Sequence, residues 1–396
     1  MSRERDSDRV PGTQADSSGP SDEPATLTGV ARVANWWRRV AAGPETPRGL
    51  NAVAAGALVF LSIPYGLVAA AALWFRSRRP TRFGVPVISV GNLVAGGAGK
   101  TPLTVYLARL LRREGRSVAV VSRGYGRRSR GTVVVSRGGK PEVKWREAGD
   151  EPYMMALLLE GVSIVVSERR SDGVRHAVDE LGADAILLDD AFQHVQLARD
   201  LDVLAVDAAR PVGNGHLLPG GPLREHPSGV GRAHVLAATR CDRAGGADRV
   251  VGSLGPLAPD ALVLETRMKP VEFWDVGTGE TVRAADIRGR PGMALSSIAD
   301  PLDFERTLGR LGMHVVGRLA LPDHHDYSGE DVEVVVEAAR EVGAETILTT
   351  EKDAVRLRPW RSRVPLVALG IDLEVTSGEE RLVEVVREVL EGRRKS

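Results

Sequence analysis

The chain has 396 residues and a formal net charge of +1. This length allows two modest domains with extensions, and the near-neutral charge excludes a dedicated nucleic-acid-binding protein, which is normally strongly basic. Its one cysteine, Cys241, excludes an intramolecular disulfide and is consistent with a reducing compartment.

The N-terminal residues 1–28 consist mainly of Ser, Asp, Arg, Pro and Gly. A segment of this composition cannot bury enough apolar surface to offset the entropy lost on ordering. We therefore predict that residues 1–28 form a disordered tail.

Residues 29–83 are predicted to form a membrane-associating helical segment. No residue from Gly49 to Phe75 carries a charge, and arginines flank this stretch on both sides. A single helix of this length would measure about 40 Å, which exceeds the ~30 Å hydrocarbon core of a bilayer. Because Pro64 and Gly66 stand near the middle, the pattern predicts two half-helices that lie in one leaflet or form a re-entrant hairpin. A buried helix of a soluble domain is the alternative.

The stretch Val85–Pro102 joins an apolar β-branched run, four glycines and a Lys-Thr pair that opens a segment with helical apolar spacing. A strand, a glycine-rich turn and a helix in this order are typical of a P-loop, where backbone N–H groups and the helix dipole bind phosphate. We predict that Lys100 contacts the β- and γ-phosphates and that the Thr101 hydroxyl binds Mg²⁺. The strict motif has a glycine where Val94 stands. The predicted nucleotide-binding residues are Gly96, Gly97, Ala98, Gly99, Lys100, Thr101 and Pro102.

Short apolar runs follow at residues 117–122, 163–167, 185–188 and 203–206, separated by segments with helical spacing. This alternation predicts βαβ units and a mostly parallel sheet with helices on both faces, an α/β fold of the P-loop NTPase type. We expect this core to cover residues 84–270.

The apolar run that begins at Ala185 ends in two acids, Asp189 and Asp190, as a Walker B element does. A carboxylate at this position binds Mg²⁺ directly or through water and would complete the metal site that Thr101 begins. The sequence does not distinguish which of the two acids contacts the metal.

Three further segments place polar side chains in loops. The segment Ser122–Arg127 (SRGYGR) follows a strand and is either a substrate-facing basic loop or a solvated turn. The Gly-Asp-Glu-Pro turn that holds Asp150 and Glu151 is either an ordinary helix start or a carboxylate site near the γ-phosphate. Arg224, in a rigid Pro- and Gly-rich loop, can stabilise a transferring phosphoryl group or bind an anionic substrate.

A smaller C-terminal α/β domain is expected over residues 271–396, where short strands alternate with helical segments. Its loop Asp323–Tyr327 contains two adjacent histidines flanked by acids. Adjacent residues of a strand point in opposite directions and lack the i, i+4 spacing of a helical zinc motif. One catalytic histidine oriented by a carboxylate is therefore favoured over a metal site.

Taken in order, these motifs resemble those of the tetraacyldisaccharide 4'-kinases, lipid A pathway enzymes that phosphorylate the 4'-hydroxyl of a tetraacylated glucosamine disaccharide 1-phosphate. The matching motifs extend over roughly residues 50–357 and are GN-x3-GG-x-GKTP, SRGYGR, GDEP, DD-x-FQH, NG-x2-LP-x-GPLRE, DHH and TEKDAV. The family usually has glycine where Ala191 stands.

The resemblance implies a membrane-bound kinase that uses ATP and Mg²⁺, with an N-terminal hydrophobic helix. The implied substrate is an acylated glucosamine disaccharide 1-phosphate at the membrane surface. The implied location is the inner membrane, with the active site facing the cytoplasm. Neither a nucleic-acid partner nor a protein partner is inferred.

The resemblance also assigns roles to residues. It makes Asp150 the catalytic base, paired with His324 rather than His325, and it places Lys100 and Arg224 in catalysis. It makes Thr101, Asp189 and Asp190 the magnesium ligands. Residues of the substrate side or rim are Arg123, Tyr125, Glu151, Gln193, His194 and Glu225.

Two alternatives stay open. The segment Thr239–Asp242 faintly resembles the guanine-reading Asn-Lys-x-Asp motif, which favours a P-loop GTPase or ATPase of the metallochaperone type. A catalytically inactive, nucleotide-binding membrane scaffold is the other alternative, and only Ala191 favours it.

Overall fold

The computed structural model describes residues 36–37, 41 and 50–392. The chain divides into two compact units, Met1–Arg38 and Arg39–Ser396. Of the first unit only Trp36 and Trp37 are described, and both are helical. The predicted disordered tail, residues 1–28, lies outside the described residues. The elements below belong to the second unit.

Helix α2 (Leu50–Ser77) is one continuous helix with Pro64 inside it, so the predicted break into two half-helices is wrong. A proline within a helix costs about 3 kcal/mol. Contacts that Ser62 and Gly66, in the neighbouring turns of α2, make with the rest of the unit offset this cost. The Ser62 hydroxyl donates to the carbonyl of Leu217 at 2.7 Å and accepts from the Gly220 N–H at 3.0 Å. A Cβ on Gly66 would lie 2.6 Å from Leu217 Cδ1, so this glycine permits close packing rather than a bend.

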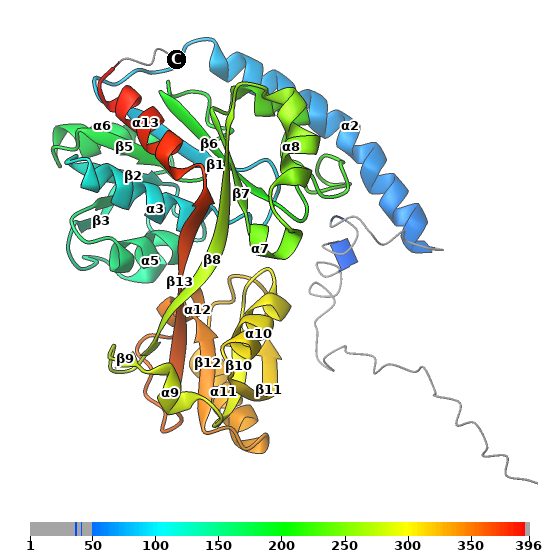
Figure 1. The fold of residues 1–396 in the computed structure, drawn as a ribbon, viewed down its shortest axis with the longest axis vertical. Helices are drawn as coiled ribbons and strands as arrows, with labels where there is room; N and C mark the ends of the chain where they lie inside the picture. The colour runs from blue at the N-terminus through cyan, green and yellow to red at the C-terminus, as the bar shows by residue number, and fades with distance from the viewer. Residues whose placement is uncertain (1–35, 38–40, 42–49, 393–396) are drawn as a thin grey trace, which may run out of the picture. The chain divides into compact units, whose positions relative to one another are not determined.

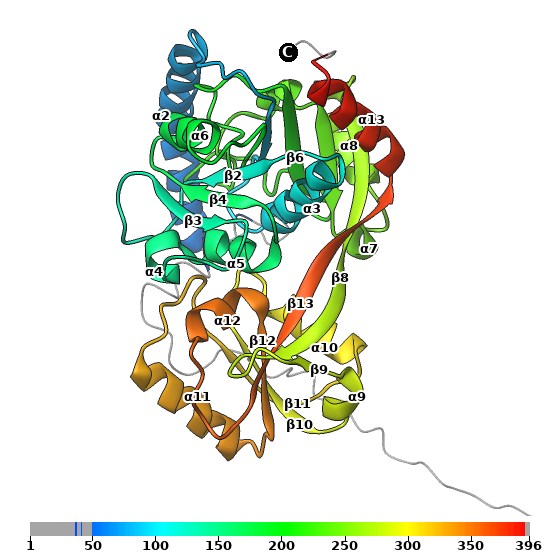
Figure 2. The ribbon, with the colours of Figure 1, turned by 90° about the vertical axis from the view of Figure 1, so that its left-hand side faces the viewer.

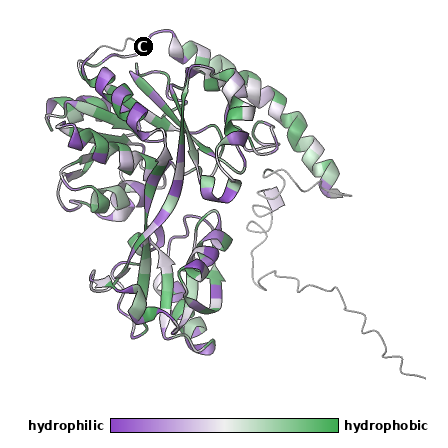
Figure 3. Cartoon of the chain, in the orientation of Figure 1, coloured by the Kyte–Doolittle hydropathy of each residue, from purple (hydrophilic) through white to green (hydrophobic). Residues whose placement is uncertain are grey.

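One stripe of α2 packs against the rest of the unit, and the other faces stay exposed and apolar (Figure 3). The buried and half-buried residues recur at helical spacing and are Ala55, Leu58, Val59, Ser62, Tyr65, Gly66, Ala69, Ala72 and Leu73. More than half of each of the following side chains is exposed: Val53, Phe60, Leu61, Ile63, Leu67, Val68, Trp74 and Phe75. Asn51–Ser77 is also long and apolar enough to cross a membrane. Apolar surface of this extent marks an interaction or membrane surface.

The larger lobe contains a sheet in the strand order β8-β7-β6-β1-β5-β2-β4-β3 (Figure 1). Its neighbouring strands are parallel except for the β3–β4 pair at the edge. The bounds are β1 (Val87–Gly91), β2 (Val118–Ser122), β3 (Val133–Arg137), β4 (Ser163–Val166), β5 (Ala185–Leu188), β6 (Leu201–Asp207), β7 (Val235–Thr239) and β8 (Leu262–Asp275). The predicted mostly parallel sheet is confirmed.

Helices cover both faces of this sheet, as predicted. Successive residues of a strand point to opposite faces, so Ile88 packs in the same core as α3 (Lys100–Arg113), whereas Val87 packs in the core of α6 (Arg170–Asp179). The remaining helices of this lobe are α4 (Trp145–Ala148), α5 (Asp150–Leu158), η1 (Pro227–Arg232), α7 (Cys241–Ala244), α8 (Asp248–Leu254), η2 (Gly255–Leu257) and α13 (Glu379–Leu390).

The smaller lobe has its own parallel strands in the order β11-β10-β12-β13 and two apolar cores, one beside α11 and α12 and one beside α10. Its strands are β9 (Thr281–Val282), β10 (Pro291–Ser296), β11 (His314–Ala320), β12 (Thr346–Thr350) and β13 (Leu366–Ser377). Its helices are α9 (Ala284–Ile287), α10 (Pro301–Arg310), α11 (Gly329–Glu341) and α12 (Glu351–Leu357).

Strands β8 and β13 run side by side as a long antiparallel pair that joins the lobes (Figure 2). The chain leaves the larger lobe along β8 and returns along β13, and α13 then packs in the same core as α3. The smaller lobe is therefore inserted between these two strands. The boundary predicted between residues 270 and 271 lies inside β8, and the division at residues 28, 83 and 270 stays a prediction.

Candidate functional site

The P-loop lies between the end of β1 and the start of α3. Gly99 precedes α3 with a φ of 78°, and a Cβ on it would lie 2.8 Å from Met268 Cε, so this position requires glycine. Side chains after β7 fix the loop backbone: Thr239 Oγ1 donates to the Ala98 carbonyl at 3.0 Å, and Arg240 Nη1 donates to the Gly97 carbonyl at 2.7 Å. No side chain of the described residues caps the first turn of α3. Its N–H groups can therefore bind an anion.

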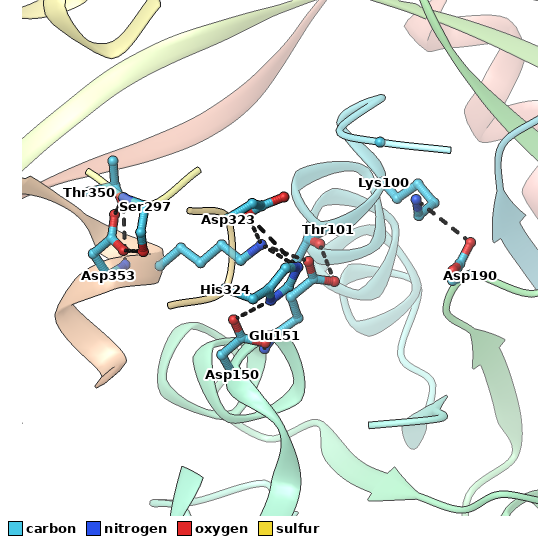
Figure 4. A network of polar contacts seen from close by, with 12 residues as sticks. Lys100, Thr101, Asp150, Glu151, Asp190, Ser297, Asp323, His324, Thr350 and Asp353 are labelled. Atoms are coloured by element: carbon cyan, nitrogen blue, oxygen red, sulfur yellow. Dashed lines mark hydrogen bonds and ion pairs between the residues drawn. The ribbon is translucent and has the colours of Figure 1, made fainter. Parts of the chain in front are cut away.

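Lys100 is half-buried at the start of α3 and faces the ends of two neighbouring strands. Its Nζ donates to Asn92 Oδ1 at 3.3 Å and lies 3.6 Å from Asp190 Oδ1 (Figure 4). Asn92 follows β1, and Asp190 follows β5, which pairs with β1. The predicted phosphate-binding lysine and one predicted metal carboxylate thus meet beside the P-loop.

The first of the two adjacent acids, Asp189, is directed into the protein. It is buried, and its oxygens accept hydrogen bonds from Thr104 Oγ1 at 3.2 Å and from Ser122 Oγ at 3.0 Å. Burial, together with the negative charges of Glu151 and Asp190, raises the pKa of Asp189 to about 6. Asp189 therefore ties the end of β5 to α3 and β2.

The second acid, Asp190, has a φ of 46° and faces basic side chains. Arg224 Nη1 donates to its two oxygens at 2.8 and 3.1 Å. Burial alone would raise the pKa of Asp190, but Lys100 and Arg224 outweigh burial and hold it below its ordinary value. Lys100, Asp190 and Arg224 therefore form one charged cluster beside the P-loop.

Arg224 also connects this cluster to α2. The Tyr65 hydroxyl donates to the Arg224 carbonyl at 3.0 Å, and the Arg224 N–H donates to the Leu93 carbonyl at 2.8 Å. The loop that carries Arg224 is thus held between the exposed apolar helix and the start of the P-loop.

Thr101 contacts a carboxylate from α5. Its hydroxyl donates to Glu151 Oε2 at 3.2 Å, and the second oxygen of Glu151 lies 3.3 Å from Lys352 Nζ (Figure 4). Glu151, predicted to belong to the rim, therefore links the P-loop to a basic residue of the smaller lobe.

Asp150 and His324 come from different lobes and are in direct contact. Asp150 is buried at the start of α5, and its Oδ2 lies 2.8 Å from His324 Nδ1 (Figure 4). Burial alone would raise the pKa of Asp150, but the hydrogen bond with His324 and the charges of Lys352 and Arg356 outweigh it and lower the pKa. The pairing predicted by resemblance is thus present in the geometry.

The neighbouring His325 faces away from Asp150. Its Nε2 lies 3.3 Å from Asp331 Oδ2, and its ring meets that of Tyr327 edge-on with 5.1 Å between centroids. Of the two histidines, the structure brings only His324 to Asp150.

A buried acid positions the backbone of His324. Asp353 is fully buried and accepts hydrogen bonds from the Ser297 N–H at 3.0 Å, from Thr350 Oγ1 at 2.6 Å and from Arg356 Nη2 at 2.6 Å. The Ser297 carbonyl in turn accepts from the His324 N–H at 3.3 Å. Figure 4 shows Ser297, Thr350 and Asp353 of this network together. Sequence reasoning noted the TEKDAV motif that contains Asp353 but gave it no role.

Lys352, from the same motif, was also missed. Its Nζ lies 3.1 Å from His324 Nε2 and 3.5 Å from Asp323 Oδ1. No local sequence pattern identifies Lys352 as a contact of His324 and Glu151, because these partners are distant in sequence.

Gln193 and Glu225, both predicted for the substrate side or rim, are joined to each other by a hydrogen bond. Gln193 Nε2 donates to the Asn92 carbonyl and to Glu225 Oε1, both at 2.9 Å. Glu225 is buried and also accepts from Arg232 Nη2 at 2.8 and 2.7 Å. These residues hold the Arg224 loop against the P-loop.

Of the remaining predicted residues, Tyr125 and Arg123 are exposed and His194 is half-buried. Tyr125 is 75% exposed, and its ring meets that of His324 edge-on at 5.6 Å between centroids. Burial, together with Arg170, Arg199 and other arginines, lowers the pKa of His194 to about 4, so this histidine is neutral at pH 7. Tyr125 is thus available to a ligand that approaches His324.

The oxygen donors beside the P-loop fit a magnesium ion. Among the described residues, no group of three His, Cys, Asp or Glu side chains has the arrangement of a metal site. Magnesium bound with a nucleotide does not need one, because waters and phosphate oxygens supply most ligands. The Thr101 hydroxyl and the carboxylates that follow β5 are hard oxygen donors of the required type.

Comparison with known proteins relates the whole arrangement to one family. Residues 54–391 match the family model described as tetraacyldisaccharide-1-P 4'-kinase. A tetraacyldisaccharide 4'-kinase of Anaeromyxobacter dehalogenans (strain 2CP-C) is 42% identical over 356 residues, which cover 88% of this chain and 92% of that protein. The protein of the same name from Anaeromyxobacter sp. (strain Fw109-5) is 46% identical over 308 residues, covering 76% and 82%. The crystal structure of LpxK from Aquifex aeolicus in complex with ATP matches with a TM-score of 0.70 at 31% identity, and covers 85% of this chain and 99% of that one.

Proposed function

Because the chain belongs to the tetraacyldisaccharide-1-P 4'-kinase family, we propose that it transfers the γ-phosphate of ATP to the 4'-hydroxyl of tetraacyldisaccharide 1-phosphate. The observation that carries the proposal is the Asp150–His324 contact at 2.8 Å, which lies next to the Glu151–Thr101 link to the P-loop. A proton acceptor and a phosphate-binding loop are thus adjacent, as phosphoryl transfer to an alcohol requires.

The P-loop and the start of α3 would bind the nucleotide phosphates, with Lys100 at the β- and γ-phosphates. Thr101 with Asp189 or Asp190 would hold Mg²⁺, which neutralises charge that develops on the phosphate oxygens. Asp190 is the better direct ligand, because its side chain is 35% exposed beside the P-loop, whereas Asp189 is buried. Arg224 adds a second positive charge beside Asp190.

Asp150 is the proposed proton acceptor for the sugar hydroxyl. An alcohol is a poor nucleophile at neutral pH, and a carboxylate within hydrogen-bond reach accepts its proton as the new bond forms. The low pKa of Asp150 keeps the carboxylate ionised, so that it carries no proton before the reaction. His324 contacts one oxygen of this carboxylate, and the exposed Tyr125 ring meets the His324 ring edge-on.

We further propose that the exposed apolar faces of α2 lie in the cytoplasmic leaflet of the inner membrane, with the active site facing the cytoplasm. A tetraacylated lipid leaves a bilayer only at a cost of ~0.8 kcal/mol per CH₂, so the enzyme must act at the surface. The hydrogen bond from Tyr65 to the Arg224 carbonyl supports this placement, because it links α2 to the loop beside the P-loop.

The metallochaperone-type alternative relied on the segment Thr239–Asp242. In the structure Thr239 and Arg240 hold the P-loop backbone, and Asp242 Oδ2 lies 3.5 Å from Arg310 Nη1. These contacts explain the polar residues of the segment without a role in reading a guanine base.

The test is to incubate the purified chain with Mg·ATP or Mg·GTP and tetraacyldisaccharide 1-phosphate in detergent micelles. We expect a product heavier by one phosphate, formed faster with ATP. Nucleotide hydrolysis that is independent of the lipid, without phosphorylated lipid, would contradict the proposal and favour the alternative.

A further inference from the structure

Lys352 contacts three groups that surround the proposed proton acceptor. It is the second residue of α12 in the smaller lobe, and its side chain is 19% exposed. Its Nζ lies 3.1 Å from His324 Nε2, 3.3 Å from Glu151 Oε1 and 3.5 Å from Asp323 Oδ1. Lys352 therefore joins both lobes at the site.

The ammonium form of Lys352 matches these partners. Burial alone would lower the pKa of Lys352, but Glu151, Asp323 and Asp150 outweigh burial and raise it above its ordinary value. A lysine ammonium has three N–H donors and no acceptor. The three donors face a ring nitrogen and two carboxylate oxygens, so each has an acceptor.

This arrangement determines which nitrogen of His324 carries the proton. An ammonium cannot accept a hydrogen bond, so the Nε2 atom that faces it must accept one and cannot be protonated. The proton of the neutral ring then lies on Nδ1, from which it points to Asp150 Oδ2 at 2.8 Å. The bond made by one ring nitrogen thus fixes the state of the other.

We propose that Lys352 is a positioning residue that holds His324 as a neutral imidazole protonated on Nδ1, and thereby orients the Asp150 carboxylate as the proton acceptor. This inference rests on the proposed kinase function for its catalytic part. Its structural part, the position of the proton on His324, can be measured independently.

Loss of the ammonium would change the ring in a defined way. Without Lys352, the carboxylates of Asp150 and Asp323 would flank His324, with Asp323 Oδ1 3.9 Å from Nε2. Two carboxylates favour the doubly protonated, positively charged ring. A charged ring would hold Asp150 in an ion pair and make it a weaker proton acceptor.

The test compares the full-length wild-type chain with Lys352→Met, using ¹⁵N-histidine NMR and steady-state kinetics. The His324 signals are identified by their loss in a His324→Gln sample. In the wild type we expect Nδ1 to be protonated and Nε2 unprotonated. In Lys352→Met we expect Nε2 to become protonated, with kcat about 10- to 100-fold lower and the KM values for Mg·ATP and lipid nearly unchanged.

Lys269→Met is the matched control. Lys269 lies on β8, is 59% exposed and pairs with Glu374 at 3.4 Å, so its loss should change neither the His324 signals nor kcat.

Three results would overturn the inference: a wild-type His324 protonated on Nε2, an unchanged His324 spectrum in Lys352→Met, or an unchanged kcat in that variant. If Lys352→Met does not fold, the ring nitrogen of His324 that is protonated in the wild-type spectrum decides whether the inference holds. A wild-type chain with Nδ1 protonated but without lipid phosphorylation would contradict the proposed function and support the positioning of His324 by Lys352.

Discussion

Two histidines that adjoin in sequence have different surroundings in the structure. His324 has a φ of 61° and contacts Asp150 of the larger lobe, whereas His325 contacts Asp331 at the start of α11. The positive φ of His324 directs successive side chains of this loop to different lobes. Of the two histidines, His324 is therefore the one placed to act with Asp150 in the proposed reaction.

We expect His324→Ala to lower kcat by about 10²-fold or more, because it removes the group that orients the proton acceptor. His325→Ala should leave kcat nearly unchanged and reduce only the stability, by about 0.2–1 kcal/mol, since it removes a partly exposed contact with Asp331. Lipid phosphorylation at saturating Mg·ATP measures both variants. A larger loss of kcat in His325→Ala than in His324→Ala would show that His325, and not His324, acts with Asp150.

Residue types and their spacing predicted Lys100 and Thr101 at the P-loop, whereas the family resemblance predicted the pairing of Asp150 with His324. The structure places these residues close to the P-loop or to one another. The sequence could not separate the roles of Asp189 and Asp190. That difference arises from the turn after β5, where the φ of 46° at Asp190 directs it to Lys100 while Asp189 contacts Ser122. Backbone geometry of this kind is not encoded by residue type alone.

At the scale of single elements, α2 shows how tertiary packing overrides a local signal. The sequence predicted the apolar segment correctly, but it also predicted a break at Pro64 and Gly66. The hydrogen bonds of Ser62 and the contact between Gly66 and Leu217 keep one helix instead. These partners lie about 150 residues away, so no local pattern could reveal them.

The exposed faces of α2 should bind membranes. We expect the double variant Phe60→Asp and Leu67→Asp to lose co-sedimentation with phospholipid vesicles, because burial of each such side chain contributes about 1.5–3 kcal/mol. The matched control places aspartates at Val271 and Val334, which are 60% and 62% exposed, compared with 71% for Phe60 and 69% for Leu67. Equal sedimentation of the two double variants would place membrane attachment elsewhere in the chain.

Helix α12 begins with a half-buried acid, Glu351, beside the strands that join the lobes. Burial, with Asp372 and Glu272 nearby, raises the pKa of Glu351 to about 7. In the unfolded chain its pKa is ~4.3. The stability linked to protonated Glu351 is therefore full below the unfolded pKa and is lost as the pH rises to about 7.

Glu351→Gln stays neutral at every pH. We therefore expect its melting temperature to exceed that of the wild type more at pH 8 than at pH 5, measured by thermal unfolding. Glu333→Gln, at an exposed position of α11, is the control and should show no such pH dependence. An increase in melting temperature for Glu351→Gln that is the same at both pH values would contradict the raised pKa of Glu351.

At the scale of the whole molecule, the site depends on an insertion. The smaller lobe lies between β8 and β13, and its loop after β11 supplies His324 to the larger lobe. Local motifs predicted the family, and the family match over residues 54–391 confirms it. They could not predict that α13 returns to the larger lobe, because the β8–β13 pairing joins residues about 100 positions apart. Lys352 and Asp353 were missed for the same reason.

The most direct test of the account is a double-mutant cycle on Asp150 and His324, with kcat measured for lipid phosphorylation. If the two residues act as a unit across the lobes, Asp150→Asn should lower kcat by about 10²–10⁴-fold, and the double variant should be no slower than Asp150→Asn alone. The affinity for nucleotide should be unchanged in all three variants. Independent, multiplicative losses, or near-normal turnover by Asp150→Asn, would contradict the account.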